Sequence, residues 1–287
     1  MIDYDPHRWW SHFFDIEGSL VREIAYRVGA CALAAAAASV AYHYHADVAI
    51  GGMPHALIGS ALSLLLVFRT NSANDRYIEG RRLWGAIVNS SRNIRRKSRN
   101  VFAAEPETID KVVEWTIAFC WATRARLIDQ KNLGPESRLP AELQAQMLAA
   151  GHPPTFAAHQ LTKIFLDAKQ RGVISDIQLQ MLDQDVQALI DLIGGCERIL
   201  STPLPYAYAV HLRRALVLYC GTLPFAIVDN FHEWTVLVAT MMGYILIGIE
   251  EIGTEIENPF GTSHNDLPLD KICGNLSTQL RDASNAP

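Results

Sequence analysis

Six residues of contrasting chemistry share one face of a helix predicted between residues 60 and 79. They are Ser60, Leu64, Phe68, Asn71, Asp75 and Glu79. Successive members are three or four positions apart, so at about 100° per residue they stay within a stripe roughly 100° wide. Repeated around an axis, the apolar members would form a constriction that gates by dewetting, and the acidic members a vestibule that favours cations. On spacing alone, Leu64 and Phe68 packing a bundle, with the carboxylates paired to Arg81, Arg82 or neighbouring chains, stays an alternative.

The helix that carries this stripe leaves an apolar run and enters a densely basic one. No Gly or Pro interrupts it between Leu62 and Glu79, and basic residues recur from Arg69 to Arg99. One continuous helix is therefore predicted to pass from an apolar environment into water. Arg69 lies about 100° from Phe68, which turns it toward a neighbouring helix or the headgroups. If Arg69 or Arg76 faced the stripe instead, the path would attract anions.

Composition leaves a membrane protein open. The chain has 287 residues, 49% of them hydrophobic, and a mean hydropathy of +0.08, slightly high for a soluble protein. The five cysteines are widely spaced without a CxxC pair, which argues against a disulfide framework or a zinc ribbon and predicts free thiols. The N-terminus lacks the basic start and apolar run of a signal peptide.

Four apolar segments are candidate membrane spans, and their flanks differ in charge. The segments cover residues 28–44, 49–68, 215–228 and 234–249. The connections within each pair contain no Lys or Arg, whereas basic residues gather on the other side. This asymmetry predicts that both termini and the middle of the chain are cytoplasmic. A soluble helical bundle with four buried helices is the alternative.

The middle of the chain is predicted to be helical and to have polar periodicity. Loops are expected at residues 132–140 and 151–155, where Pro and Gly cluster, and the helix from residue 175 is expected to break at Gly194 and Gly195. The predicted organisation is an N-terminal cytoplasmic or interfacial segment, a membrane hairpin, a helical cytoplasmic domain, a second membrane hairpin and a cytoplasmic C-terminal segment. These cover residues 1–27, 28–68, 69–212, 213–252 and 253–287.

Other motifs give little support for catalysis. The chain has no GxGxxG, P-loop or GxSxG pattern, so we expect no catalytic residues, no cofactor and no enzyme activity. Histidines at His43 and His45 are spaced for a solvated turn rather than a metal site. The run RNIRRKSRN, residues 92–100, is expected to contact lipid or a neighbouring subunit rather than nucleic acid.

Two separated motifs resemble the bestrophin family. FRTNSANDRYIEGRRLWGAIVNSSR, residues 68–92, is similar to the signature that follows the second membrane helix of bacterial bestrophins. EIENPFGTSHNDLPLDKIC, residues 255–273, is similar to the second signature, built around N-P-F-G and an acidic loop. The resemblance implies a homopentameric ion channel in the bacterial inner membrane. It also implies an all-α fold with four membrane helices and a large helical cytoplasmic domain.

The resemblance also assigns expected roles to individual residues. Ser60, Leu64 and Phe68 correspond to the rings of the apolar neck, with Ser60 smaller than the usual family residue. A second restriction near the cytoplasmic exit would fall at Ile177 or Gln178. After N-P-F-G, animal members hold calcium in a carboxylate-rich clasp, whereas the loop from Asn258 to Asp266 lacks most of those carboxylates, so no metal is expected.

The sequence therefore leads to a passive channel for small ions. Ten carboxylates from Asp75 and Glu79 in a pentamer favour monovalent cations such as sodium and potassium. A chloride channel of the same architecture is the first alternative. A membrane-anchored scaffold or receptor that does not conduct is the second, and a soluble helical enzyme is the third. The expected partners are further copies of the chain, the bilayer and small inorganic ions, without nucleic acid.

Overall fold

A computed structural model describes residues 20–44, 47–130, 132, 134 and 138–282 of the chain. The predicted N-terminal segment up to residue 19, His45 and the last five residues lie outside the described part. Two compact units are present. The first comprises residues 1–77 and 203–258, and the second comprises residues 78–202 and 259–287. These divisions differ by several residues from the predicted domain boundaries.

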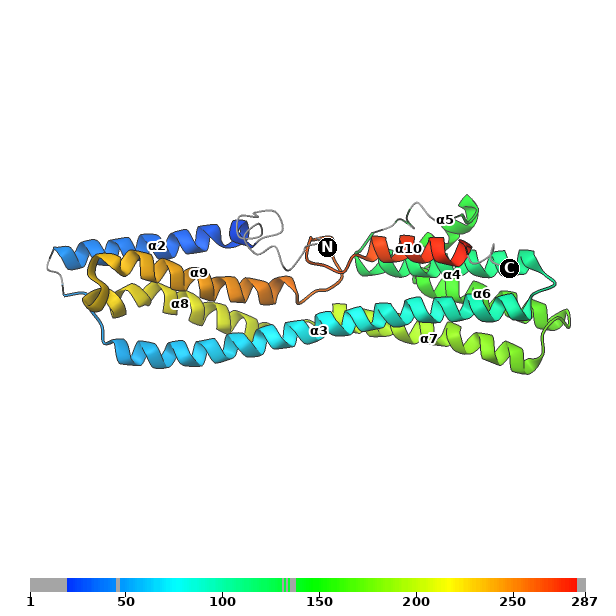
Figure 1. Cartoon of the computed structure of the whole chain (residues 1–287), viewed down its shortest axis with the longest axis horizontal. Coiled ribbons are helices and arrows are strands. Elements are labelled where there is room, and N and C mark those ends of the chain that lie inside the picture. Colours follow the sequence, from blue (N-terminus) through cyan, green and yellow to red (C-terminus); the bar gives the residue numbers. More distant parts are fainter. Residues whose placement is uncertain (1–19, 45–46, 131, 133, 135–137, 283–287) are drawn as a thin grey trace. The chain divides into compact units, whose positions relative to one another are not determined.

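The first unit is a helical bundle whose helices run side by side (Figure 1). Helices α2 (Val21–His43), α8 (Tyr206–Phe231) and α9 (Thr235–Glu255) pack against one another, with the short 3₁₀ turn η1 (His232–Trp234) between the last two. Their shared core is aliphatic and includes Leu216, Leu223 and Leu246. Where lipid covers the outside of such a bundle, close van der Waals packing and hydrogen bonds between the helices, rather than burial of apolar surface, hold it together.

Helix α3, Gly52–Val101, is continuous and contributes its first half to this unit. That half packs on α8: the rings of His55 and Tyr219 stack with centroids 4.4 Å apart, and the Tyr208 hydroxyl donates to the Leu65 carbonyl at 2.8 Å. Gly59 is needed because a Cβ there would lie 2.5 Å from the Tyr219 hydroxyl oxygen. The continuity predicted from the sequence is therefore present.

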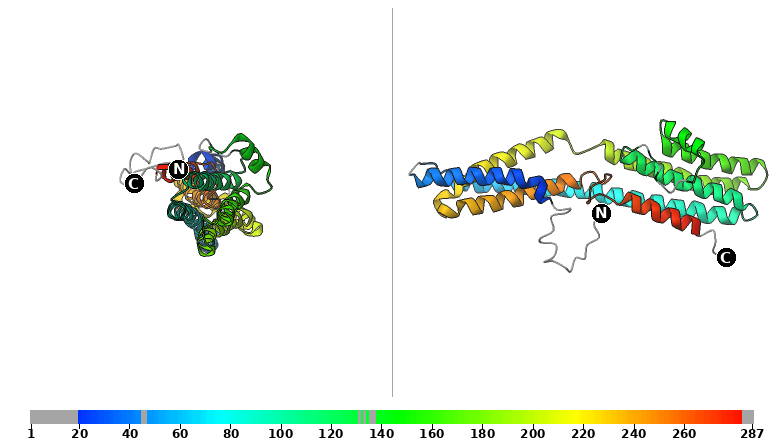
Figure 2. Two further views of the ribbon diagram at one scale, coloured as in Figure 1. Left: turned by 90° about the vertical axis from the view of Figure 1, so that its right-hand side faces the viewer. Right: turned by 90° about the horizontal axis from the view of Figure 1, so that it is seen from above.

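The second unit is built around α4, Pro106–Leu127, whose middle turns are buried on every side. The second half of α3, α6 (Pro153–Gln170), α7 (Asp176–Ser201) and α10 (Leu269–Asp282) belong to the same unit, and α5 (Ala141–Ala149) packs on α6. Figure 2 gives a second direction of view on these helices. A helix that is apolar all round is stable only as the centre of such a bundle.

Helix α7 corrects one prediction from the sequence. It continues to Ser201 through Gly194 and Gly195, where a break was expected. The reason is packing: a Cβ on Gly195 would lie 2.9 Å from a methyl carbon of Leu83 in α3. The glycine lets two helices approach closely, and the surrounding helix supplies the hydrogen bonds that offset its low helical propensity.

All five cysteines are free and buried, as their spacing predicted. In the second unit, burial raises the pKa of the Cys120 thiol to about 12, and burial also raises the pKa of Cys273 well above its ordinary value. The two contact each other through the Cys273 thiol and the Cys120 carbonyl oxygen, 3.7 Å apart. Thiols held neutral in this way are packing groups rather than nucleophiles.

Helices long and apolar enough to cross a membrane occur in three ranges of the described chain. They are Val21–His43, Gly52–Val101 and Tyr206–Glu255. The last range contains both α8 and α9. The prediction of four spans stays a prediction.

Two glycines of α3 provide a matched test of this packing. A Cβ on Gly80 would lie 2.9 Å from Cγ of Pro259 and 3.0 Å from Cζ of Phe260, whereas one on Gly85 would meet nothing within 4 Å. Gly80→Ala should lower the free energy of unfolding by about 1–3 kcal/mol through overpacking. Gly85→Ala should raise it by about 0.5–1 kcal/mol, because alanine favours the helix. Thermal unfolding of the detergent-solubilised chain measures both, and equal effects would contradict the packing described.

Candidate conduction face and the arginine–glutamate cluster

The predicted stripe lies on the exposed side of α3. Leu64 and Phe68 are each 55% exposed, and Ser60 is exposed as well. The buried residues of the same half of the helix lie on the opposite side, and they include Leu62, Leu66, Arg69 and Ala73. Large apolar side chains left open in a single chain require lipid or another copy to cover them.

The lower part of the stripe is polar and accessible. Asn71 and Asp75 are exposed and Glu79 is half-buried, and no salt bridge joins Asp75 or Glu79 to another residue of the described chain. The alternative in which these carboxylates pair with Arg81 or Arg82 of the same chain is therefore not seen. At the other end, the Ser60 hydroxyl donates to the Ala56 carbonyl at 2.9 Å. Its oxygen remains available as an acceptor.

The two candidates for the second restriction differ in what their side chains do. Gln178 caps the start of α7. Its side-chain Oε1 accepts from the Ser175 backbone N–H at 2.8 Å, and its backbone N–H donates to the Ser175 hydroxyl at 3.3 Å. Ile177 beside it is 79% exposed. The capping box occupies the polar side chain and leaves the apolar one outward.

The loop after N-P-F-G uses its carboxylate to form a turn. Asp266 is 7% exposed, and its Oδ2 accepts from the Ser263 backbone N–H at 2.6 Å. The Leu267 N–H closes the loop on the Pro259 carbonyl at 3.0 Å. Asn258 precedes that proline, outside any helix. Asp266 is thus a structural residue of the turn.

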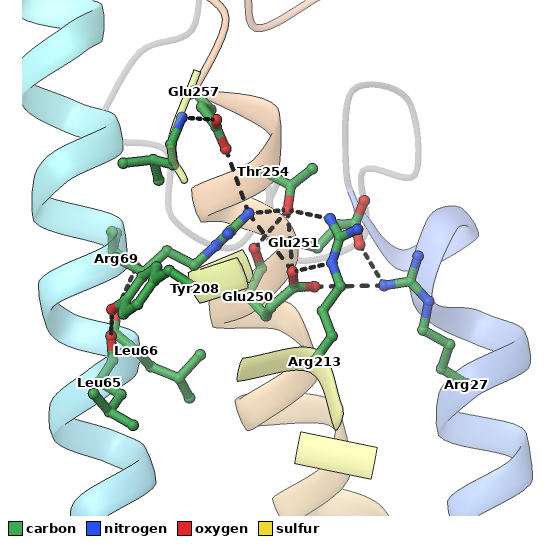
Figure 3. Close-up of polar contacts among 12 residues, drawn as sticks. Arg27, Leu65, Leu66, Arg69, Tyr208, Arg213, Glu250, Glu251, Thr254 and Glu257 are labelled. Atoms are coloured by element: carbon green, nitrogen blue, oxygen red, sulfur yellow. Dashed lines mark hydrogen bonds and ion pairs between the residues drawn. The ribbon is translucent and has the colours of Figure 1, made fainter. Parts of the chain in front are cut away.

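A cluster of charges, the arginine–glutamate cluster, links all four long helices of the first unit around the buried Arg69 and Glu250 (Figure 3). Its members are Arg27 of α2, Arg69 of α3, Arg213 of α8, Glu250, Glu251 and Thr254 of α9, and Glu257 just after α9. Three guanidinium groups face three carboxylates, so the cluster is formally neutral. Ionisable groups at the end of an apolar bundle are tolerated only when paired in this way.

Arg69 is the centre of the cluster on the α3 side and is 1% exposed. Its Nη2 donates to the Thr254 hydroxyl at 2.6 Å and lies 3.6 Å from carboxylate oxygens of both Glu250 and Glu257. Its Nε and Nη1 are buried without a hydrogen-bond partner in the described chain. The prediction that Arg69 faces a neighbouring helix is confirmed, and its charge depends on the α9 carboxylates.

Glu250 forms ion pairs with arginines of α2 and α8 as well. It is 2% exposed. Its Oε1 accepts from Arg213 Nε at 2.9 Å, and its Oε2 lies 3.7 Å from Arg27 Nη1. Glu251 accepts from the same Arg27 nitrogen at 2.5 Å. Gly253 leaves room for this arrangement, because a Cβ there would lie 3.3 Å from Arg69 Nε.

The sequence analysis did not predict the residues that form this cluster. Thr254 bridges two arginines, since its hydroxyl also lies 3.3 Å from Arg213 Nη2. Arg27 and Arg213 each lie beside a predicted span, where a basic residue on its own indicates only the cytoplasmic side. The available signal was the spacing of Glu250 and Thr254, four positions apart on α9, with Glu257 just after that helix.

Comparison with known proteins now decides the family. The family model for Bacterial/Fungal Bestrophin protein matches residues 1–282. The chain belongs to the bestrophin family. This bestrophin is 36% identical to a voltage-dependent anion channel-forming protein of Nostoc sp. (strain PCC 7120) over 96% of this chain and 91% of the relative. It is 29% identical to one of Escherichia coli (strain K12) over 98% of this chain and 93% of the relative.

Solved structures agree with this assignment. A bacterial bestrophin homologue from Klebsiella pneumoniae superposes with a TM-score of 0.87 at 29% identity, covering 92% of this chain and 99% of that one. A membrane protein structure carrying a substitution S19A gives 0.86 at 30% identity and covers 92% and 99%. The present bestrophin is therefore an all-helical membrane protein of a channel-forming family, and not an enzyme.

Neutralising one buried carboxylate tests the arginine–glutamate cluster. Glu250→Gln removes the charge that faces Arg69 and Arg213 while keeping the side-chain size. The free energy of unfolding should fall by about 1–3 kcal/mol, because the buried Arg69 keeps only Glu257 as a counter-charge while Arg213 stays partly in contact with solvent.

The control is Glu23→Gln on α2, an exposed glutamate whose replacement should change stability by no more than about 0.5 kcal/mol. Thermal unfolding in detergent distinguishes the two variants. A Glu250→Gln protein as stable as the control would show that the cluster does not hold α9 to the other helices.

Proposed function

We propose that this bestrophin forms an ion channel in which the first half of α3, from several copies, surrounds a central path, and that anions are the permeant class. The observation that carries the choice of ion is the agreement among relatives. Those that align with nearly the whole chain are named voltage-dependent anion channel-forming proteins. We infer the same activity for this chain.

The lining follows from the exposed stripe of α3. Leu64 and Phe68 project from the subunit, and five copies around an axis, the number that the family resemblance implies, would place them in two apolar rings below a ring of Ser60. Rings of this kind carry no charge, so they select for size and wetting rather than for the sign of the ion. Ile177 is our candidate for a second apolar ring nearer the cytoplasmic exit.

The membrane arrangement rests on charge asymmetry. We propose that α2, α3, α8 and α9 are four spans of the bacterial inner membrane. Lys and Arg are missing from residues 46–68 and from the connection between α8 and α9, and this absence supports an outer location for those ends. Both termini and the second unit are then cytoplasmic, and the arginine–glutamate cluster lies near the inner headgroups.

Cations are the second candidate, and a specific observation favours them. Asp75 and Glu79 continue the conduction stripe, and neither has a salt-bridge partner in the described chain. Repeated around the axis, these carboxylates would concentrate sodium or potassium. The choice between the two classes depends on whether this acidic vestibule or another part of the path sets the barrier.

Reversal potentials in planar bilayers test the selectivity. Under a tenfold gradient of potassium chloride, an ideally selective channel reverses near about 59 mV, with a sign that gives the permeant ion. For an anion channel, Asp75→Asn with Glu79→Gln should keep the chloride sign and raise the chloride current, because repulsion at the vestibule is removed. A cation channel would lose selectivity in the same variant.

The matched control is Asn74→Asp, which adds an exposed carboxylate beside the stripe. It should shift the reversal potential less than the double substitution of Asp75 and Glu79 does. A wild-type potential of cation sign would overturn the anion assignment. A folded oligomer that carries no current would support a scaffold instead.

Leu64→Ala tests the neck. Shortening a ring of exposed leucines widens and wets the constriction, so single-channel conductance should rise. Ile58→Ala is the control, since Ile58 is 54% exposed on α3 but lies outside the stripe. Both substitutions should alter stability by less than about 1 kcal/mol because both side chains are exposed. Equal conductance in the two variants would remove Leu64 from the path.

A further inference from the structure

The basic run of α3 forms a pocket in the second unit that the proposed channel function does not use. The pocket has a volume of about 630 Å³ and is lined by Arg92, Arg95, Arg96, Arg99, Gln279 and Leu280. The four arginines are spaced three, one and three residues apart, which puts them on one face of α3. We call this the arginine pocket. Asn100 completes its lining, which contains no acidic residue.

The pocket differs from an ordinary solvated basic face at Arg95 and in its salt bridges. Arg95 is only 5% exposed, and its Nε donates to the Leu280 carbonyl at 3.1 Å. No carboxylate of the described chain forms a salt bridge with Arg92, Arg95 or Arg96. Burial, with Arg99 acting in the same direction, lowers the pKa of Arg95, and Asp110 opposes this only in part. A buried guanidinium without a counter-charge is unfavourable.

Neighbouring basic residues of the same unit, in contrast to these arginines, form salt bridges. Lys97, within the same run, pairs with Asp185 at 2.7 Å, and Arg281, beside the pocket residues of α10, pairs with Glu114 at 2.8 Å. Within the described residues, the unit therefore places carboxylates at salt-bridge distance from cations on either side of the pocket and none at that distance from Arg92, Arg95 or Arg96. Like charges at these spacings repel one another, so an anion bound among them would be stabilised.

The shape of the pocket indicates the ligand. Gln279 Oε1 accepts from Arg92 Nε and Nη2 at 3.2 and 2.6 Å, which fixes that guanidinium against α10. Arginine forks match phosphate oxygens in paired hydrogen bonds. Four of them along two turns of helix suit several linked phosphates better than one. The lining has no aromatic ring on which a base would stack, which disfavours nucleic acid.

We propose that the arginine pocket binds the oligophosphate group of a soluble metabolite. Recognition involves the phosphates alone, so inorganic tripolyphosphate, ATP and GTP should bind with similar affinity. Single inorganic phosphate should bind more weakly. The binding does not depend on whether the protein conducts, so a silent channel leaves this proposal testable.

Calorimetric titration of the full chain in an uncharged detergent, with tripolyphosphate as the probe and salt held constant, measures the affinity. The test variant is Arg92→Gln with Arg96→Gln, two exposed positions of the pocket, and it should bind about tenfold more weakly or worse. The matched control is Arg81→Gln with Arg82→Gln, which removes the same charge from exposed positions of α3 outside the pocket. It should bind like the wild type.

Circular dichroism and gel filtration verify that both variants fold. Equal weakening in the test and control variants would reduce the effect to net charge and overturn the proposal. So would the absence of measurable binding to the wild type at millimolar tripolyphosphate. A third arm adds nanodiscs of neutral or anionic lipid: if anionic lipid alone abolishes tripolyphosphate binding in the wild type, the occupant is a lipid headgroup and not a soluble metabolite.

Discussion

The pairing of Arg69 with the carboxylates of α9 is the constraint on which the conduction face depends. Arg69 is almost fully buried and reaches Thr254, Glu250 and Glu257. A guanidinium in this position can be accommodated in only one rotation of α3, because every other rotation would expose it to apolar surroundings without a partner. The opposite side of the helix then carries Leu64 and Phe68 outward. A buried polar contact thus determines which apolar residues stay available to surround a path.

The arginine–glutamate cluster is formally neutral, which lowers the cost of placing charges in the bundle. Its geometry favours one register of the helices. Arg27, Arg69 and Arg213 come from three different helices and converge on α9. Apolar packing between membrane helices allows sliding and rotation, since lipid chains are as apolar as leucine. Charge-assisted hydrogen bonds have fixed directions and do not allow it. The aliphatic core of the unit stabilises the bundle, whereas the cluster selects one register of its helices.

The sequence predicted the helices well because each carries a strong local signal. The long run without Gly or Pro predicted α3, and the spacing of Ser60, Leu64 and Phe68 predicted one shared face. The prediction from the sequence was wrong at Gly195. A glycine often ends a helix, but here close packing against Leu83 keeps it within α7. The sequence also could not find Thr254 or the partners of Glu250, since the contacts join residues more than thirty positions apart. The sequence could not predict the ion selectivity, because selectivity depends on how several copies of the chain assemble.

The two halves of α3 each contain a buried arginine, and these arginines differ in their salt-bridge partners. In the first unit Arg69 is buried and compensated by carboxylates of the same chain. In the second unit Arg95 is also buried, and its Nε donates to the Leu280 carbonyl. Asp110 attracts it electrostatically, but no carboxylate of the described residues forms a salt bridge with it. Burial of a charge is unfavourable in both places, and only the first is offset by salt bridges of the described chain. The second has no salt-bridge partner within the described chain, which is the physical ground for treating it as a binding site rather than as part of the scaffold.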